Sequence, residues 1–419
     1  MKRRIPAVLS LLLICFSVLK APAQVQLTDS AKISLLTASP WHGAVYALFG
    51  HTAILVQDDA TGVNAVFNYG FFDSSQPNFI YHFVKGETDY ILGVTSFEDF
   101  LSEYSYKGQE VTVQELNLSP AGKQQLYEAL SINALPQNRE YRYNFFYDNC
   151  ATRPRDMVEN QTEGEILYAD TLREQTYRDL VHECTEDYPW LLFGIDLVIG
   201  SEADRIIGVR EKMFIPRYLM NSFEDASVQK NDTLRHSLVK KQEVVLKLDS
   251  EKNRPKVSTP LTPFIIAILL LVTTLFISLF QLIKLNITKF PLFYDTLLFG
   301  IAGLGGVVLF FLMFFSEHPA MIPNWNFVWL NLFALIAAFL FWVNSAKNIV
   351  YFYHFINFAL LTLFLFLWWL IPQTLPAATI PFSMNLWLRS GVNLLLWKKK
   401  KQKDKRFRSS RYLKAGWGQ

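Results

Sequence analysis

The C-terminal part of the chain is dominated by long apolar runs. Four runs after residue 260 are each apolar over about the length that a helix needs to cross a bilayer: Pro263–Ile283, Phe293–Phe315, Phe327–Val343 and Val350–Ile371. A fifth run, Ala377–Trp397, is weaker because Arg389 interrupts it. We therefore predict an all-α bundle of about five transmembrane helices over residues 261–397.

The preceding part of the chain has a different pattern. Residues 24–224 mix short β-type runs with amphipathic helical ones, and no apolar stretch there is long enough to span a bilayer. This pattern predicts an exported domain of the α+β class. Residues 225–260 are polar and rich in Lys, with Pro255 and Pro260 near the end. We predict a partly helical juxtamembrane connector for this segment.

The first residues have the pattern of a secretory signal peptide. Three basic residues are followed by an apolar stretch from Ile5 to Val18 and by the sequence Ala-Pro-Ala, which ends at Ala23. We predict that residues 1–23 are a leader that is cleaved after Ala23. Cys15 lies inside this leader, so the mature chain would keep two cysteines, Cys150 and Cys184.

The charge distribution predicts how the helices are oriented in the membrane. The chain has a formal charge of +3, yet residues 398–419 contain ten Lys or Arg and one acid, Asp404. A basic segment directly after an apolar run is typical of the cytoplasmic membrane face and does not indicate a nucleic-acid partner. With five spans, the connections that carry Lys284, Lys289 and Lys347 lie on that same face. We therefore predict an inner-membrane protein with its folded domain outside and a cytoplasmic tail.

A first candidate for chemistry is His51. Gly50 permits a turn immediately before it, and the apolar β-branched residues that follow predict a strand that begins at His51. Residues 63–69 would form the second strand of a hairpin. A single His at the start of a strand is more often structural than catalytic, but a cysteine elsewhere in the chain changes this interpretation.

That cysteine is Cys150, in the segment Tyr-Asp-Asn-Cys-Ala-Thr-Arg-Pro-Arg-Asp. Pro154 suits the first turn of a helix, so Cys150 would lie just before a helix N-terminus, where the helix dipole favours a thiolate. Arg153 and Arg155 are candidates to stabilise the thiolate, whereas Asp148 opposes it. The sign of the net pKa shift is therefore open.

A thiol nucleophile needs a base, and the base needs a group that orients its ring. We predict His51 as the base and interpret His82, which lies among aromatic residues, as a packed side chain. Asn68 and Asp73 are the candidates to orient His51, although both could instead cap turns.

Several other chemistries are disfavoured. The sequence has no metal-ligand spacing and no Gly-rich phosphate loop, so we predict neither a metal site nor a nucleotide cofactor. The main structural alternative to catalysis is a disulfide between Cys150 and Cys184, because an exported domain folds in an oxidising compartment.

The motifs together resemble a known family. They are Phe-Gly-His-Thr-Ala-Ile at residues 49–54, Asn-Tyr-Gly at 68–70, the segment 148–156 around Cys150, and the loop residues 316–319 and 324–326. In this order, and with the membrane half, they resemble the Lnb family of bacterial lipoprotein N-acyltransferases. The sequence Trp41-His42-Gly43-Ala44-Val45 departs from the acidic turn expected ahead of Phe49. The order of His before Cys also resembles the permuted NlpC-type branch of the papain-like superfamily.

This resemblance implies an activity. Cys150 would take a fatty acyl group from a phospholipid as a thioester, with His51 as base, and pass it to the N-terminal amine of a lipoprotein on the periplasmic side of the inner membrane. Glu317, His318 and Asn324, in an outside loop of the membrane half, are candidates to position substrate groups, although Glu317 and His318 could instead be simply solvated.

Two other functions remain open at this point. The same Cys and His chemistry cleaves amides when water is the acceptor, as in a cell-envelope amidase or peptidase that acts on peptidoglycan peptides. Alternatively, the chain could be a non-enzymatic envelope binding module whose two cysteines form a disulfide.

Overall fold

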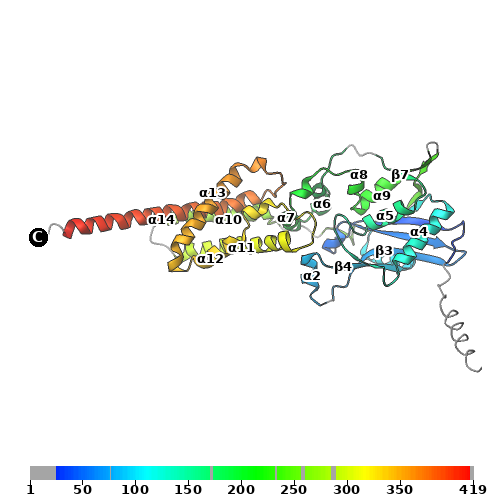
Figure 1. Ribbon diagram of the computed structural model, residues 1–419, viewed down its shortest axis with the longest axis horizontal. Helices are drawn as coiled ribbons and strands as arrows, with labels where there is room; N and C mark the ends of the chain where they lie inside the picture. Colours follow the sequence, from blue (N-terminus) through cyan, green and yellow to red (C-terminus); the bar gives the residue numbers. More distant parts are fainter. Residues whose placement is uncertain are drawn as a thin grey trace, which may run out of the picture.

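The computed structural model describes residues 25–415 except 76, 170–172, 232–233, 256–259 and 285–288. The predicted leader and the last four residues of the predicted tail lie outside the described residues. A β-rich domain forms one end of an elongated molecule and a helical bundle forms the other, with the last helix extending beyond the bundle (Figure 1).

A seven-stranded sheet forms the centre of the β-rich domain. Its strand order is β10-β5-β1-β2-β3-β4-β6, and every neighbouring pair is antiparallel. The strands are β1 (Lys32–Ala38), β2 (His51–Asp58), β3 (Val63–Phe71), β4 (Asp89–Thr95), β5 (Val111–Leu116), β6 (Glu140–Arg142) and β10 (Val239–Leu246).

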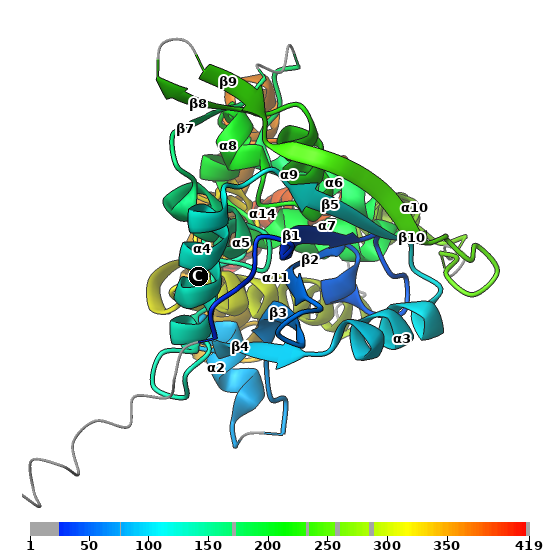
Figure 2. The same cartoon turned by 90° about the vertical axis from the view of Figure 1, so that its right-hand side faces the viewer.

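Both faces of this sheet are covered, because successive side chains along a strand point to opposite sides. Ile33, Leu35 and Ile54 pack under the helices α4 (Pro120–Asn133), α5 (Thr152–Gln161) and α9 (Pro216–Glu224). Leu36, Ala53 and Leu55 lie on the other face with Phe100 and Tyr104 of α3 (Phe97–Lys107). Figure 2 shows α3 apart from α4 and α5 around the sheet. The predicted mixed fold of the exported domain is confirmed.

The prediction of a partly helical connector after residue 224 is wrong. This segment forms three strands: β8 (Ser227–Asn231) and β9 (Leu234–Ser237), which join β7 (Glu165–Leu167) in a small sheet, and β10, which pairs with β5. The centre of β10 is exposed and charged, as edge strands commonly are to prevent pairing with other chains. The exposed Lys residues of β10 made this edge strand resemble a polar connector in the sequence.

A second, smaller core lies between the sheet domain and the membrane half. It is built from the helices α6 (Tyr177–Thr185) and α7 (Pro189–Val198), and from Phe146 and Phe214. The short helix α8 (Val209–Lys212) instead packs through Val209 against the core of the sheet domain. Thr176 caps α6 in a capping box with Asp179, and Pro189 begins α7, where its missing N–H has no helical partner to lose.

The membrane half consists of α10 (Pro263–Ile283), α11 (Lys289–Phe315), α12 (Leu332–Leu340), α13 (Lys347–Phe366) and α14 (Thr379–Ala415). Among the described residues, three helices are long and apolar enough to cross a membrane, and they contain α10, α11 and α13. The predicted third span is shorter than expected: a 3-10 turn at Trp325–Val328 precedes the nine residues of α12. The predicted fifth span is the first half of α14, where Arg389 is buried.

Small residues allow two of these helices to pack closely. A Cβ atom at Gly303 or Gly306 of α11 would lie within 3 Å of backbone atoms of Leu335 or Asn331 at the start of α12. Small residues allow this backbone approach in lipid, where van der Waals contact rather than the hydrophobic effect drives helix association. Substitution of either glycine by a larger residue would therefore force α11 and α12 apart.

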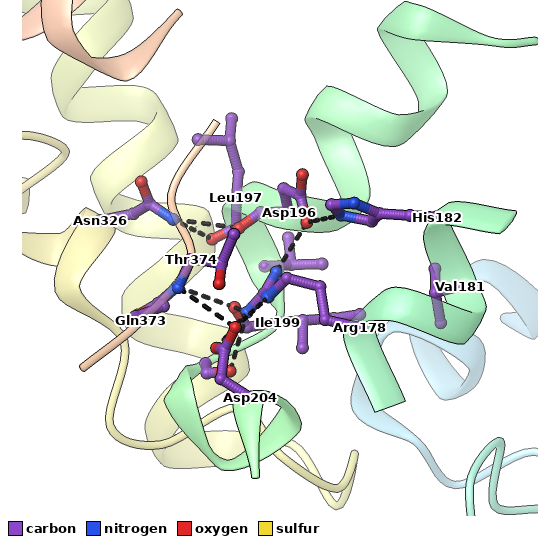
Figure 3. A network of polar contacts seen from close by, with 12 residues as sticks. Arg178, Val181, His182, Asp196, Leu197, Ile199, Asp204, Asn326, Gln373 and Thr374 are labelled. Carbon is purple, nitrogen blue, oxygen red and sulfur yellow. Dashed lines mark hydrogen bonds and ion pairs between the residues drawn. The ribbon is translucent and has the colours of Figure 1, made fainter. Parts of the chain in front are cut away.

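The two halves of the molecule are joined by a buried polar network (Figure 3). Arg178 of α6 donates to Asp196 of α7 at 2.6 Å and to Asp204 at 2.9 Å. From the membrane half, the amide of Asn326 donates to the carbonyl of Asp196, and that of Gln373 donates to the carbonyl of Ile199. These amides satisfy carbonyls at the end of α7 that have no helical partner. These hydrogen bonds connect the β-rich domain, through α7, to the helical bundle.

Candidate active site

The position of Cys150 is set by its neighbour Asn149. The Asn149 side chain accepts from the backbone N–H groups of Ala151 and Thr152 and donates to the carbonyls of Phe145 and Phe214. It therefore caps the start of α5 and ties that start to two segments of the second core. Sequence reasoning had assigned no role to Asn149, although Asn before a helix is a common capping signal.

His51 is the first residue of β2, and its ring is held on two sides. It stacks on Tyr104 of α3, with ring centroids 6.2 Å apart and planes 17° apart. Its Nε2 lies 3.3 Å from Oδ1 of Asn68 on β3. The Asn68 amide group donates to Thr95 Oγ1 and to the Val66 carbonyl.

This arrangement defines the protonation of the imidazole. Because the Asn68 NH₂ group has its own acceptors, its Oδ1 accepts from His51, and Nε2 carries the proton. Nδ1 is left with a free lone pair, and among the described residues no hydrogen bond reaches it. Asn68, which was predicted to orient His51, therefore holds the ring in the form in which Nδ1 can accept a proton.

Three observations place Cys150 beside His51. The β2–β3 register pairs Ala53 with Asn68, and His51 and Gly70 each lie two residues from this pair in their own strands. A Cβ atom at Gly70 would lie 3.5 Å from the Cys150 Cβ. The backbone N–H of Thr52, next to His51, is close enough to the Cys150 thiol to lower its pKa. Gly70 has a φ of +110°, which favours glycine, so the strand bends where Cys150 approaches.

Burial controls the electrostatics of both groups. Removal from water raises the pKa of the Cys150 thiol to about 11, and the N–H groups of Thr52 and Cys150 only partly oppose this shift. Burial likewise lowers the pKa of His51 to about 4, against a smaller raising effect of Asn68. Near neutral pH the resting site therefore holds a thiol and a neutral imidazole. No hydrogen bond joins the two in this structure, and such contacts often form only when substrate binds.

The two predicted thiolate-stabilising arginines have other partners. Arg153 forms a two-pronged ion pair with Asp148 and lies 3.7 Å above the Tyr141 ring. Arg155 is buried and bonds Asp156 and the carbonyl of Arg210. Neither arginine contributes to the pKa shift of Cys150, so their predicted role has no support here.

The other sequence candidates lie outside the site. Asp73 accepts from the backbone and hydroxyl of Ser75 in an exposed turn, as a turn cap would. His82 is not a packed residue: its side chain is 47% exposed and faces Glu87. Cys150 and Cys184 are both free thiols, with Cys184 in α6, so the structure does not contain the alternative disulfide. The described residues contain no cluster that could hold a metal ion.

Comparison with family models gives two matches. The Lnb N-terminal periplasmic domain matches residues 22–183, and the Lnb transmembrane domain matches residues 254–401. The chain belongs to the Lnb family. The comparisons with curated proteins and with solved structures found no match.

Lnb membership defines the setting of the site. The chain is a membrane-anchored protein with a periplasmic N-terminal domain, and the match to that domain contains His51, Asn68 and Cys150. Residues 184–253, between the two Lnb matches, supply α7, which binds the membrane half, and β10, which completes the large sheet. The two Lnb domains are therefore integrated into one structure.

The predicted substrate-positioning residues of this Lnb chain lie at the junction of its two domains. Glu317 pairs with Arg142 of β6 at 2.7 Å, and His318 contacts the carbonyl of Phe83 at 2.8 Å. Asn324 is buried and donates to the carbonyls of Leu197 and Val198 at the end of α7. All three have structural partners, and a role in binding substrate stays a prediction.

Proposed function

We propose that this protein is a lipoprotein N-acyltransferase that uses Cys150 as its nucleophile and His51 as its base. The observation that carries this proposal is the bond between His51 Nε2 and Asn68 Oδ1, on a strand whose Gly70 adjoins Cys150. It leaves Nδ1 of a neutral imidazole available to take a proton from the thiol. The family membership and the membrane anchor support a lipid substrate.

In the first half-reaction, the Cys150 sulfur attacks the carbonyl carbon of a phospholipid acyl ester while its proton moves to His51 Nδ1. The ester C–O bond then breaks, and the proton passes to the departing glycerol oxygen. The products are a Cys150 thioester and a lysophospholipid. Because the resting pair is neutral, no separated charge has to be buried before substrate arrives.

In the second half-reaction, the N-terminal amine of a lipoprotein attacks the thioester carbonyl. His51 accepts the amine proton, the C–S bond breaks, and the proton returns to the Cys150 sulfur. The product is an amide-linked acyl chain. The backbone N–H groups of Cys150 and Thr52, which lie nearest the sulfur, are our candidates to stabilise the oxyanion in both steps.

Mass spectrometry of the N-terminal lipopeptides of native lipoproteins tests this proposal. Cells would carry the intact protein, Cys150→Ala, or the control Cys184→Ala, at equal protein level. We expect N-acylated lipopeptides with the intact protein and with Cys184→Ala, and their loss with Cys150→Ala. Unchanged N-acylation in the Cys150→Ala cells would refute the proposal and favour hydrolysis of envelope peptides or a binding role.

A further inference from the structure

The helix α2 (Phe79–Lys85) is an unusual surface element of the periplasmic domain. None of its residues is buried, and Ile80, Tyr81 and Phe83 are 77%, 53% and 49% exposed. Exposed apolar side chains that gather on one short element indicate contact with a partner or a membrane.

The membrane half holds α2 in place. Tyr81 lies against Phe311, about one turn before the end of the membrane-spanning helix α11, with ring centroids 6.5 Å apart. Beyond that end, the backbone N–H of Glu317 donates to the carbonyl of Lys85 at 2.8 Å. Figure 1 shows α2 beside the end of α11 that faces the periplasmic domain. The apolar surface of α2 is thus continuous with that of a helix that lies in lipid.

A row of aromatic rings leads from α2 toward Cys150. Phe79 of α2 stacks on Phe72, Phe72 contacts Tyr90 at 5.1 Å, and Tyr90 stacks on Tyr143 at 4.2 Å between ring centroids. Tyr90 and Tyr143 lie within the electrostatic range of a Cys150 thiolate, which adds to the effect of burial in raising the pKa of both, so the row runs toward the sulfur.

We propose that α2 lies in the outer leaflet of the membrane and that the Phe79-Phe72-Tyr90 row receives the acyl chain of a membrane phospholipid and guides it to Cys150. The occupant is a lipid acyl chain, because the surface joins α11 and is apolar and aromatic. Aromatic side chains are enriched at the level of lipid headgroups. The path of the acyl chain rests on the proposed function. The insertion of α2 into the outer leaflet is independent of that function.

The depth of α2 is tested on the full chain in phospholipid vesicles. A nitroxide label is placed at Ile80→Cys, with the native cysteines replaced by alanine, and its relaxation is measured with oxygen and with a water-soluble nickel chelate. The control is Ile132→Cys on α4, which is 54% exposed and lies in the sheet domain. We expect oxygen to dominate at position 80 and nickel at position 132. Dominance of nickel at both positions would overturn the proposal, whatever the enzyme's activity.

The path of the acyl chain is tested with the double variant Ile80→Glu/Phe83→Glu, with Ile132→Glu as control. The double variant is expected to lower N-acylation by vesicle phospholipid by about tenfold or more, because two charges are placed in lipid. Labelling of Cys150 by a small water-soluble thiol reagent should stay unchanged in both. Equal N-acylation by the double variant and the control would refute the path of the acyl chain. If the unmodified protein itself showed no N-acylation, the proposed function would be refuted instead.

Discussion

Two polar clusters in this protein, one buried and one partly buried, differ in how completely their groups are paired. In the membrane half, Arg389 donates to both oxygens of Asp295, at 2.5 and 2.9 Å, and to Ser278 and Gln281. In the periplasmic domain, the Cys150 thiol and His51 Nδ1 are not hydrogen-bonded to each other, and among the described residues the His51 ring has a partner at Nε2 and none at Nδ1. The ionic groups of the first cluster are paired with each other and with neighbouring polar side chains. In the second cluster, the S–H group of Cys150 and the lone pair of His51 Nδ1 are not paired with each other.

This difference follows from charge. An ion pair away from water is tolerated only when its donors and acceptors are matched, because each ion loses its hydration. Neutral groups carry a smaller burial cost, so a thiol and an imidazole can stay unpaired at an active site. Complete pairing indicates a structural cluster, and an unpaired neutral base beside a thiol indicates chemistry.

The largest expected effect comes from removal of either unpaired group. His51→Ala or Cys150→Ser should lower the rate of acyl transfer by roughly 10³-fold or more, because nucleophile and base act as one unit. The measurement is the rate of thioester formation, followed by the mass of the intact protein after addition of phospholipid. The double variant should be no slower than the slower single variant. Additive losses would show that the two residues do not work together.

The next effect comes from breaking the paired cluster. Asp295→Ala leaves Arg389 buried without its counter-ion, which should destabilise the bundle by about 3–5 kcal/mol. Thermal unfolding in detergent measures the change. The variant Asp295→Leu/Arg389→Met removes both charges and should regain most of the stability. If the double variant is as unstable as Asp295→Ala, charge burial is not the cause.

Acid should weaken the periplasmic domain through His51. Its pKa is about 6.5 in the unfolded chain and about 4 when buried, so the unfolded state binds more protons between these values. The stability contributed by the buried neutral ring is therefore present above pH 6.5 and is lost as pH falls toward 4, by about 3 kcal/mol at most. His51→Gln should lose less stability between pH 7 and pH 4.5, as measured by denaturant unfolding. An equal loss in both proteins would contradict this prediction.

The smallest effect concerns the orientation of the base. Asn68→Ala removes the acceptor that holds His51 Nε2 and should lower the rate about 10–100-fold, in line with other groups that orient a histidine. Asn68→Asp should retain more activity and move the acidic limb of the rate profile to higher pH, because a carboxylate stabilises the imidazolium form. A profile identical to that of the unmodified protein would show that residue 68 does not act through His51.

Local signals in the sequence were sufficient for several parts of the fold. The strand that begins at His51 and the helix that follows Cys150 were predicted because Gly50 and Pro154 mark the boundaries of these elements. Asn68 was found because it lies on the neighbouring hairpin strand. The apolar runs predicted α10, α11 and α13, but the run that contains α12 was read as a full span although its helix is short.

The sequence by itself determined that His51 begins a strand, that Cys150 precedes a helix, and that the chain is anchored in a membrane. These features depend on turn, capping and apolar residues that are close together along the chain. Only the tertiary structure decided that Arg153 pairs with Asp148 instead of the thiol, that β10 completes the sheet beside β5, and that α2 meets α11. It also decided the pKa values of Cys150 and His51, because burial is created by residues distant in sequence and exceeds the local effect of a helix start.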